Sequence, residues 1–444
     1  MLNGTRARAF LQSVPRILYD RHASPASIAR FQDRRLRAVV RHAYEHVPYY
    51  RRLFDDAGIK PSEIRSRADL RLIPITTKET LRALSMDEIV ADDADKPRLQ
   101  KFETNGSTGV PLNVYRSKGE SATWLALVWR ARTELGIGRG HRMASINWGT
   151  PKRTADTPKA KRPLLFRIAG LQSWDRIDCR EPVDVIVDRL REARPDGITG
   201  YASVLSRVAD VLGADQSELR PKFILSASEV LTPSMRSRIE QVFRAPVHDI
   251  YASWEFNLMA YECPIGKTYH VCDDNIIMEV LRDGRDVGPG ESGEVVGTSL
   301  QFSAMPLIRY QIGDVVTRGR DRCSCGSPFS TLTAIQGRMV DYFRLPDGRV
   351  MHPYEMGKIL WKTAFRCMKQ YQIVQTTPGD VVLRIVLRSE CDRTDVAEVI
   401  EQVRNLLGPL VTLTIEYLDE IQPGAKGKFG VYSSMVSSEY SSTG

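Results

Sequence analysis

Strand-like and helix-like segments alternate regularly between residues 142 and 252. Short apolar runs at 142–147, 196–201, 222–227 and 247–252 favour strands. The segments between them have the apolar spacing of amphipathic helices, namely PVDVIVDRLREAR, ASVLSRVADVL and PSMRSRIEQVF. Alternation of this kind argues for parallel strands joined by crossover helices. We therefore expect an α/β core.

The segments before and after this region have different sequence patterns. Residues 28–57 have a helical pattern, and turns are expected at Ala57-Gly58 and Ile73-Pro74. Residues 275–281 and 293–300 are typical of antiparallel strands. Near the C-terminus, strand-like segments at 380–387 and 411–418 flank TDVAEVIEQVRNLL, whose apolar residues share one helical face. This β-α-β pattern predicts a small α+β domain after about residue 340.

Length and composition exclude several classes of protein. The 444 residues with 42% hydrophobic content favour two or three domains with large cores. No run approaches the ~18 apolar residues of a membrane helix, and MLNGTRARAF lacks the apolar core of a secretory signal. We therefore expect a cytoplasmic protein without a membrane span.

The net charge of +9 is concentrated near the N-terminus. Residues 1–82 hold 15 Arg and 2 Lys against 8 Asp and Glu, so the rest of the chain is neutral overall. This basic region is a solvated helix face or a surface for an anionic partner, such as a nucleotide-bearing cosubstrate or an acidic carrier protein. It carries no aromatic and basic RNA-binding motif, so no nucleic acid is expected.

The segment TNGSTGVPL, residues 104–112, is rich in glycine and in hydroxyl side chains. Glycines let successive N–H groups converge on an anion, and hydroxyls reach phosphate oxygens or a magnesium ion. The spacing is neither that of a P-loop nor that of a dinucleotide fold. Taken alone, a segment of this kind is more often a plain turn than a phosphate-binding loop.

Further motifs follow in an order that resembles the adenylate-forming enzymes. They are TNGSTG at 104–109, HDIYASWE at 248–255, MPLIRYQIGDVV at 305–316, QGRMVDYFRLPDGRV at 336–350 and GAKGKFG at 424–430. Four other segments are similar to the phenylacetate-CoA ligase branch and its capsular-polysaccharide-biosynthesis relatives: VPYYRRLFDDAGI, LIPITTKETLR, TGYASVLSRVA and SASEVLTPSMR. The resemblance covers nearly the whole chain.

The resemblance implies a fold and an activity. The fold would be a large N-terminal adenylation domain over residues 1–337, with mixed sheets and a basic helical region at 1–90, and a mobile α+β lid over 338–444. The activity would be ATP-dependent formation of an acyl- or aryl-adenylate with release of pyrophosphate. The acyl group would pass to a thiol, either coenzyme A or the phosphopantetheine of a carrier protein. Two alternatives remain: transfer to an amine or hydroxyl, and a non-catalytic, zinc-stabilised nucleotide-binding protein.

The resemblance also implies residue roles, and the chemistry of two approaching anions agrees with them. The β- and γ-phosphates would be held by Thr104, Asn105, Gly106, Ser107, Thr108 and Gly109. Glu255 would bind Mg²⁺, which prefers hard oxygen ligands. Asp314 would accept hydrogen bonds from the ribose hydroxyls. Lys428 would be the catalytic cation that bridges the carboxylate and the α-phosphate.

The remaining implied contacts concern the base, the hinge and the acid. Ser228, Glu229 and Tyr251 would line the adenine pocket, and Arg338 would contact ribose or phosphate. The substrate would be a small carboxylic acid; Trp148 and Trp254 near the expected pocket favour an aromatic one, but they are equally compatible with a role in the core. The oligomeric state is not readable from the sequence, and a homodimer is the one assembly considered.

Three positions depart from the family pattern. Val110 stands where the phosphate loop often has lysine, and Ala252 replaces the usual glycine after the tyrosine. Val340 occupies a hinge position that commonly carries aspartate, although Asp341 follows directly. Val110 removes one expected pyrophosphate contact, unless another basic residue supplies it. Val340 lies at the hinge and so bears on domain rotation and on the second half-reaction.

Seven cysteines are an odd count in a chain expected to be cytoplasmic, so no disulfide framework is expected. A structural zinc site is predicted, stapling residues 263–325, with the ligands Cys263, His270, Cys323 and Cys325, and unliganded thiols are the alternative. Cys272 is the rival of His270 for the fourth position. We expect ordinary thiols at Cys179, Cys367 and Cys391.

Overall fold

The structure is a computed structural model of the chain. It describes residues 17, 19–104, 112–137, 140–147, 173–179, 181–213, 218–320, 322–338, 343–351, 356, 359–360, 367–422 and 431–436. The chain divides into two compact units. Unit 1 comprises Met1–Gly138 and Ile250–Gln336, and unit 2 comprises Arg139–Asp249 and Gly337–Gly444. The boundary expected between residues 337 and 338, with a mobile lid beyond it, stays a prediction.

Unit 1 begins with two helices, α2 (Pro25–His46) and α3 (Pro48–Asp56). The Ser24 hydroxyl caps α2 by accepting a hydrogen bond from the backbone N–H of Ser27. The helix stops at Val47, because the next residue is a proline that disfavours helical geometry in the residue before it. The predicted helical segment 28–57 is therefore confirmed, with one break. Short helical segments follow at Pro61–Glu63, Arg67–Leu72, α4 (Lys78–Arg82), α5 (Met86–Ile89) and Lys96–Arg98.

Several arginines of the basic region have structural partners. Arg35 donates to the carbonyl oxygen of Leu300 from two nitrogens, at 3.0 and 2.8 Å, and Arg37 donates to the carbonyl of Arg65 at 2.7 Å. Arg52 pairs with Glu88 at 2.8 Å. Part of the positive excess therefore ties α2 and α3 to neighbouring segments of unit 1.

The sheet of unit 1 runs in the order β11-β10-β12-β13-β14-β9-β8-β7. Neighbours such as β10 and β12, β12 and β13, and β7 and β8 pair antiparallel. This confirms the antiparallel strands predicted at 275–281 and 293–300. The bounds are β7 (Val247–Ser253), β8 (Asn257–Glu262), β9 (Tyr269–Val271), β10 (Ile276–Arg282), β11 (Arg285–Asp286), β12 (Ser292–Ser299), β13 (Tyr310–Arg318) and β14 (Thr331–Arg338).

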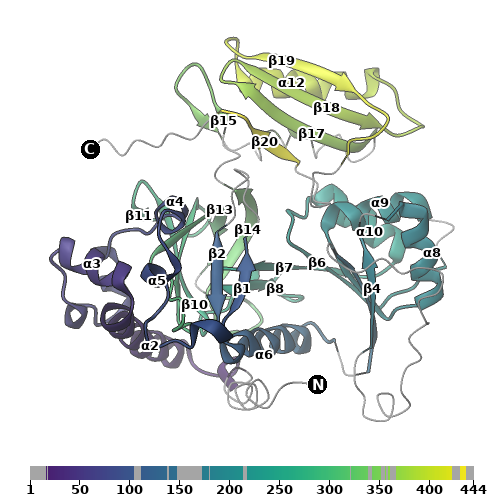
Figure 1. Ribbon diagram of the computed structural model, residues 1–444. Helices are drawn as coiled ribbons and strands as arrows, with labels where there is room; N and C mark the ends of the chain where they lie inside the picture. The colour runs from purple at the N-terminus through teal and green to yellow at the C-terminus, as the bar shows by residue number, and fades with distance from the viewer. Residues whose placement is uncertain are drawn as a thin grey trace. The chain divides into compact units, whose positions relative to one another are not determined.

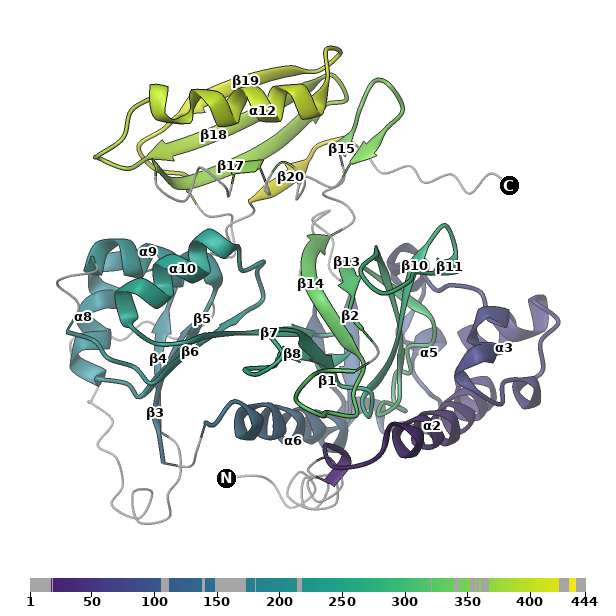
Figure 2. The same ribbon diagram turned by 180° about the vertical axis from the view of Figure 1, so that it is seen from behind.

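A hairpin and a long helix complete unit 1. Strands β1 (Gln100–Glu103) and β2 (Asn113–Arg116) pair antiparallel and lead into α6 (Lys118–Glu134). Ser117 and Glu120 start this helix as a capping box, in which each side chain accepts a backbone N–H of the other residue. In Figures 1 and 2, α2, α3 and α5 gather on the β10 side of the unit, and α6 lies beside β8.

The parallel part of unit 2 confirms the alternation read from the sequence. Strands β3 (Arg142–Asn147), β4 (Ser173–Asp178), β5 (Gly197–Gly200) and β6 (Phe223–Ala227) lie in the order β6-β5-β3-β4, and their pairings are parallel. The crossover helices are α8 (Val183–Ala193), α9 (Ala202–Leu212) and α10 (Pro233–Phe243). Gly197 is required by close packing, because a Cβ there would lie 2.3 Å from the Phe223 ring.

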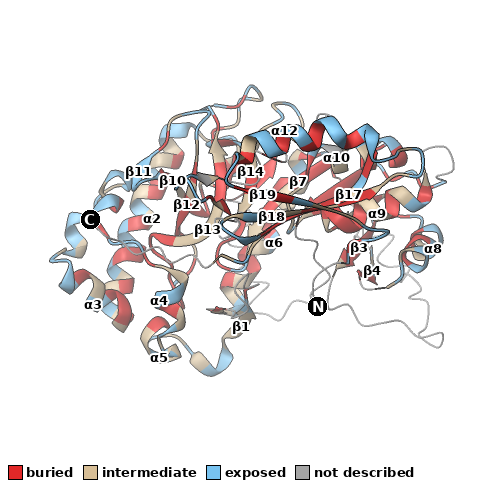
Figure 3. Cartoon of the chain, turned by 90° about the horizontal axis from the view of Figure 1, so that it is seen from above, coloured by how far each residue is buried: buried red, intermediate tan, exposed pale blue. Residues whose placement is uncertain are grey.

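The C-terminal segment of unit 2 is the predicted β-α-β unit within a four-stranded sheet of order β19-β18-β17-β20. Its elements are β17 (Met368–Thr377), β18 (Asp380–Leu387), a 3₁₀ turn (Thr394–Val396), α12 (Ala397–Leu407), β19 (Thr412–Tyr417) and β20 (Tyr432–Ser434). A two-stranded ribbon, β15 (Phe343–Arg344) with β16 (Val350–Met351), precedes it. Helix α12 buries Val399, Val403 and Leu407, and its opposite face is exposed (Figure 3).

One cysteine prediction is wrong. Cys367 and Cys391 form a disulfide, with their Cα atoms 5.4 Å apart, and are not separate thiols. The reason is the β17–β18 hairpin: Cys367 directly precedes β17, and its carbonyl accepts a hydrogen bond from the N–H of Arg388 at the end of β18. The hairpin register therefore brings the two cysteines together. Cys179 is a buried thiol that forms no disulfide, as predicted.

The expected fold class, mixed α/β with a small α+β segment at the C-terminus, is confirmed. Across the part of the chain that the structure describes, no helix has the length and hydropathy needed to cross a membrane.

Candidate active site and metal centre

The predicted phosphate loop connects β1 to β2. Thr104, at its start, is buried, and its backbone N–H donates to the carbonyl oxygen of Leu112 at 2.9 Å. The N–H of Leu112 donates back to Thr104 Oγ1, also at 2.9 Å. These two bonds close the base of the loop. The predicted phosphate ligands Asn105, Gly106, Ser107, Thr108 and Gly109 lie outside the described residues, as does Val110.

Glu255, the predicted magnesium ligand, lies in the turn between β7 and β8. Ser253 pairs with Asn257 across the hairpin, and the backbone N–H of Phe256 donates to Ser253 Oγ at 3.0 Å. Asn257 adopts a left-handed backbone with a φ of 61°, a conformation that asparagine tolerates better than most residues. The turn holds Glu255 in a buried position.

Arg116, the last residue of β2, connects the loop hairpin to this turn. Its guanidinium is buried and donates to Asn257 Oδ1 and to the carbonyl oxygen of Trp254. The Trp254 ring stacks on Phe102 of β1, with ring centroids 4.9 Å apart. The strands on either side of the predicted phosphate loop are therefore fixed against the Glu255 turn.

The electrostatics of the turn agree with this connection. Burial lowers the pKa of Arg116 to about 10, while the carboxylates of Glu120 and Glu255 act in the opposite direction. The guanidinium also lies over the Phe302 ring, 4.3 Å from its centroid. Arg116 thus supplies positive charge next to Glu255 and restricts the turn that carries it.

The predicted base-binding and ribose-binding residues of unit 1 are in direct contact. Tyr251 Oη donates a hydrogen bond to Asp314 Oδ2 at 2.7 Å. Tyr251 is a buried residue of β7, and Asp314 follows Gly313 in β13. Gly313 has a φ of 82°, which favours glycine at this position. The two motifs predicted from separate parts of the sequence therefore converge.

Glu294 of β12 adds a titratable group close to Asp314. The pKa of Glu294 is raised to about 7. Burial is the main cause, the charge of Asp314 acts in the same direction, and the hydrogen bond from Gln311 acts in the opposite direction. Gln311 Nε2 donates to Glu294 Oε2 at 2.6 Å. Glu294 was not predicted from the sequence.

The other predicted nucleotide contacts belong to unit 2 or lie outside the described residues. Ser228 follows β6 with a left-handed φ of 70°. Glu229 Oε2 accepts the backbone N–H of Ser203 at 2.9 Å, which places this carboxylate at the N-terminus of α9. Arg338 is the last residue of β14. The catalytic candidate Lys428 and the positions Val340, Asp341 and Trp148 fall outside the described residues.

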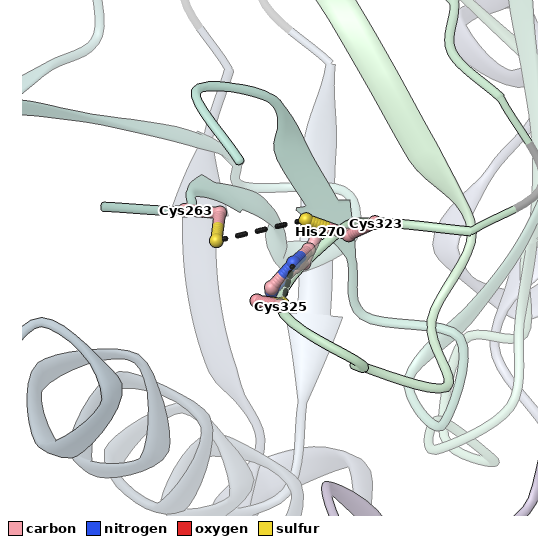
Figure 4. A group of neighbouring side chains, drawn as sticks. All are labelled: Cys263, His270, Cys323 and Cys325. Carbon is pink, nitrogen blue, oxygen red and sulfur yellow. Dashed lines mark hydrogen bonds between the residues drawn. The ribbon is translucent and has the colours of Figure 1, made fainter. Parts of the chain in front are cut away.

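The four predicted zinc ligands are brought together in unit 1. Cys263 follows β8, His270 lies in β9, and Cys323 and Cys325 lie in the connection from β13 to β14. Their donor atoms all lie within 4.8 Å of one another, and Figure 4 shows the side chains pointing toward a common centre. The pairing of His270 with Thr331 between β9 and β14 holds the two halves in register.

The distances within this cluster match a tetrahedral zinc site. Two sulfurs bound to one zinc at about 2.3 Å are about 3.8 Å apart, and a sulfur and an imidazole nitrogen about 3.5 Å. Cys263 Sγ and Cys323 Sγ are 3.7 Å apart, and Cys325 Sγ lies 3.3 Å from His270 Nε2. A disulfide would need about 2.05 Å, so the cysteines of the cluster are free thiols.

Backbone N–H groups around the cluster donate to two of its sulfurs. Gly266 N–H donates to Cys263 Sγ at 3.3 Å, and Ser327 N–H donates to Cys325 Sγ at 3.4 Å. Burial raises the pKa of Cys323, but hydrogen bonds from the Cys325 backbone and from His270 outweigh burial and lower it to about 6. Only glycine fits at residue 266, because a Cβ there would lie 2.2 Å from Cys323 Sγ.

Comparison with known proteins agrees with this geometry. A family model described as the CapK C-terminal domain matches residues 344–434. A phenylacetate-coenzyme A ligase from Escherichia coli (strain K12) is 27% identical over 318 residues, which cover 66% of this chain and 68% of that protein. Protein CapK of Staphylococcus aureus is 22% identical over 378 residues, covering 82% of this chain and 80% of CapK.

A solved structure shows the same fold. The crystal structure of a 2-hydroxyisobutyryl-CoA ligase in the postadenylation state has a TM-score of 0.74 and 20% identity, covering 90% of this chain and 88% of the ligase. The chain is similar over most of its length to the phenylacetate-CoA ligase-like branch of the adenylate-forming enzymes. The resemblance inferred from its motifs is thereby confirmed.

Within this branch, the glycine-to-alanine departure coincides with a local irregularity. The register of the β7–β8 pairing shifts between Tyr251 and Ala252. The shift lies directly beside the tyrosine that contacts Asp314. Ala252 therefore lies at an irregularity of the strand that carries the predicted base-binding residue Tyr251.

Cys272 was the other candidate for the fourth ligand position. It lies outside the cluster of Cys263, His270, Cys323 and Cys325. It is fully buried, and burial raises the pKa of its thiol to about 12. It packs with Leu127, Leu258 and Tyr261 in an apolar cluster. Of the two candidates for the fourth position, His270 is the one that lies in the cluster.

The sequence alone did not reveal several residues of the site. Arg116 and Asn257 are single polar residues beside strands, and no local pattern distinguishes them from surface residues. Phe102 has the alternation of an ordinary strand residue. The sequence did offer one partial signal for the stacked pair. Phe102 lies two residues before the TNGSTG segment, and Trp254 lies within HDIYASWE.

Proposed function

We propose that this chain is an ATP-dependent acid–thiol ligase that forms an acyl-adenylate and transfers the acyl group to coenzyme A. The observation that carries the proposal is the convergence in unit 1 of motifs far apart in sequence. Tyr251 contacts Asp314, and Arg116 connects the base of the phosphate loop to the Glu255 turn. Relatives named as CoA ligases support the same reaction class.

In the first half-reaction, a carboxylate oxygen of the acid attacks the α-phosphorus of ATP. A new P–O bond forms, and the bond to the pyrophosphate leaving group breaks. Glu255 would hold Mg²⁺, which neutralises phosphate charge. The loop from Thr104 to Gly109 would orient the departing phosphates, and Asp314 would hold the ribose hydroxyls. Lys428 would stabilise the charge that develops between the carboxylate and the α-phosphate.

In the second half-reaction, the thiol sulfur attacks the carbonyl carbon of the adenylate. The thiol proton is lost to solvent, a C–S bond forms, and AMP leaves with the former carboxylate oxygen. The lid over residues 338–444 would rotate between the two steps and remove Lys428 from the site. Coenzyme A is the acceptor favoured by the named relatives, and a carrier-protein phosphopantetheine is the finer alternative.

The acid that we propose is small and aromatic. Trp254 stays 47% exposed while one of its faces stacks on Phe102. An exposed indole next to Glu255 offers a flat apolar surface for a planar substrate. An acid with a bulky aliphatic chain gains less from such a surface.

The direct test is an assay of AMP and thioester formation with a panel of aryl and short acyl acids, ATP, Mg²⁺ and coenzyme A. We expect acid-dependent AMP release with an equal amount of acyl-CoA identified by mass spectrometry. AMP release without a thioester, replaced by an amide or ester when an amine or alcohol is added, would favour the synthetase alternative. ATP binding without AMP release for any acid would favour the non-catalytic protein.

We also propose a structural zinc ion bound by Cys263, His270, Cys323 and Cys325. Support comes from the sulfur–sulfur and sulfur–nitrogen separations and from the backbone N–H groups aimed at two of the sulfurs. Four protein ligands leave no open position for substrate, so the ion would stabilise the fold of unit 1. A homodimer and an acyl carrier partner for the basic N-terminal region remain proposals for solution measurement.

A further inference from the structure

Helix α6 ends next to the candidate metal centre. Its last residue, Glu134, places Oε2 3.5 Å from Nδ1 of His270. The same oxygen accepts a hydrogen bond from Tyr261 Oη at 2.8 Å. The side chain of His270 is only 2% exposed and that of Glu134 is 17% exposed, so water screens this pair weakly.

The two nitrogens of His270 have different surroundings. Nε2 faces Cys325 Sγ at 3.3 Å, on the cluster side of the ring. Nδ1 is buried and has no hydrogen-bond partner among the described residues, and Glu134 is the charged group that faces it. A metal-bound histidine commonly donates its second ring N–H to a carboxylate, which fixes the tautomer and orients the ring. A small shift of the ring or of Glu134 would complete this hydrogen bond.

A second contact attaches the same helix to the cysteine loop. The guanidinium of Arg130, one turn before Glu134, lies over the ring of Phe329 at 4.6 Å from its centroid. Phe329 follows Cys325 in the connection from β13 to β14. Arg130 is itself fixed by two hydrogen bonds to Asp274, at 2.5 and 3.0 Å. The C-terminal turn of α6 therefore touches both halves of the cluster.

We propose that Glu134 is a positioning residue of the metal centre: its carboxylate, held by Tyr261, accepts the Nδ1–H of His270 and keeps Nε2 directed at zinc. Through this contact the ion fixes the last turn of α6, the helix that follows the phosphate-loop hairpin. The inference rests on the proposed zinc site. The competing explanation is a metal-free ion pair, in which a protonated His270 faces Glu134 and the thiols stay unliganded.

The test compares Glu134→Ala and Glu134→Gln with the wild type, each purified without added zinc. Zinc content is measured first, and zinc affinity is then measured by competition with a chromophoric chelator. We expect Glu134→Ala to bind zinc about ten- to a hundredfold more weakly, the usual effect of removing such a partner. Glu134→Gln keeps an acceptor oxygen and should lose less. Glu279→Gln is the matched control, because Glu279 is similarly buried and pairs with Arg309 at 3.0 Å away from the cluster. Its zinc affinity should not change.

Two further readouts separate a positioning role from a general loss of stability. Cobalt substituted into Glu134→Ala should show altered visible absorption bands, while Glu279→Gln keeps the wild-type spectrum. In the wild type, removal of zinc should accelerate amide hydrogen exchange in residues 127–134 more than in α2. The wild-type exchange measurement applies even if Glu134→Ala does not fold.

The outcomes distinguish the two proposals. A wild-type protein that contains no zinc and binds none would overturn the metal site and the role of Glu134 with it. A zinc-containing wild type, together with unchanged affinity in Glu134→Ala and unchanged exchange in α6, would overturn the role of Glu134 alone.

Discussion

Tyr251 Oη donates a hydrogen bond to Asp314 Oδ2 at 2.7 Å, joining two motifs that are 63 residues apart in the sequence. Tyr251 belongs to β7 and Asp314 to β13, at separate positions in the sheet of unit 1. The bond orients the carboxylate that we assign to the ribose. It therefore ties the geometry of the predicted adenine pocket to that of the ribose site.

Removing this hydrogen bond should weaken ATP binding. Tyr251→Phe is expected to raise the KM for ATP several-fold and to lower the free energy of unfolding by about 1 kcal/mol, the usual effect of one lost hydrogen bond. Steady-state kinetics and urea denaturation measure the two effects. Tyr44→Phe is the control, because it removes a Tyr44–Asp55 hydrogen bond of 2.9 Å elsewhere. An unchanged KM in Tyr251→Phe would separate Tyr251 from nucleotide binding.

Arg116 should matter for both stability and magnesium dependence. Arg116→Gln removes a buried guanidinium next to Glu255 and Glu120, leaving two carboxylates without its charge. The variant also leaves Asn257 Oδ1 and the carbonyl oxygen of Trp254 without their donor, and a buried acceptor left unpaired typically destabilises by about 1–3 kcal/mol. We also expect the variant to need more Mg²⁺ for half-maximal activity, because the Glu255 turn is less restricted.

The control for this variant is Arg52→Gln. Arg52 is 52% exposed and pairs with Glu88 on the surface, so its loss should change the unfolding free energy by less than about 1 kcal/mol. Equal destabilisation by the two substitutions would show that Arg116 is not a central connection of the site.

Much of the secondary structure was predictable because burial follows local periodicity. The apolar spacing of residues 394–407 located α12, and the alternation at 142–252 located β3, β5 and β6 with their helices, whereas β4 was not predicted. The order of the antiparallel strands was not predictable, since β9 pairs with β14 across about sixty residues. That order depends on contacts that no short window of sequence contains.

The site was predictable to the extent that chemistry restricts residue types. Cys263, His270, Cys323 and Cys325 stood out because few other residues bind a soft cation. Arg116 did not, because its partners Trp254 and Asn257 lie 138 and 141 residues away in sequence. The disulfide was missed because an odd cysteine count was taken as evidence against pairing, whereas the β17–β18 register decides it.

Stability should depend on pH through Glu294. Its pKa is raised from 4.5 to about 7, mainly by burial. Below pH 4.5 the carboxyl is protonated in both states. Between pH 4.5 and 7 the folded state keeps a proton that the unfolded state has released, so stability falls as pH rises, and above about pH 7 this dependence ends. The total change is on the order of 3 kcal/mol.

Glu294→Gln should remove this dependence. The free energy of unfolding of the variant, relative to that of the wild type, should increase as the pH rises from 4.5 to 8. Urea denaturation at several pH values measures this difference. Glu88→Gln is the control, because a hydrogen bond from the Ser85 backbone lowers the pKa of Glu88 below 4.5, so its difference in stability from the wild type should stay constant between pH 4.5 and 8 and change only at lower pH. A constant difference between Glu294→Gln and wild type over this range would contradict the assigned pKa.

The proposed zinc site predicts that replacing one ligand thiol lowers both the zinc content and the thermal stability of the protein. Cys323→Ser should reduce zinc content from one equivalent to a small fraction and lower the melting temperature of the purified protein. Treatment of the wild type with a strong chelator should lower the melting temperature by a similar amount. Cys179→Ser is the matched control, because Cys179 is a buried thiol outside the disulfide and outside the cluster. Equal metal content in both variants would remove the zinc assignment.

The central claim is that this chain adenylates a carboxylic acid with the help of Lys428. The most direct measurement is acid-dependent exchange of labelled pyrophosphate into ATP, comparing the wild type with Lys428→Ala over the same panel of acids. We predict exchange with at least one aromatic acid in the wild type and its loss in a Lys428→Ala protein that keeps the wild-type melting temperature. Exchange with none of the acids despite ATP binding, or equal exchange in both proteins, would contradict the account.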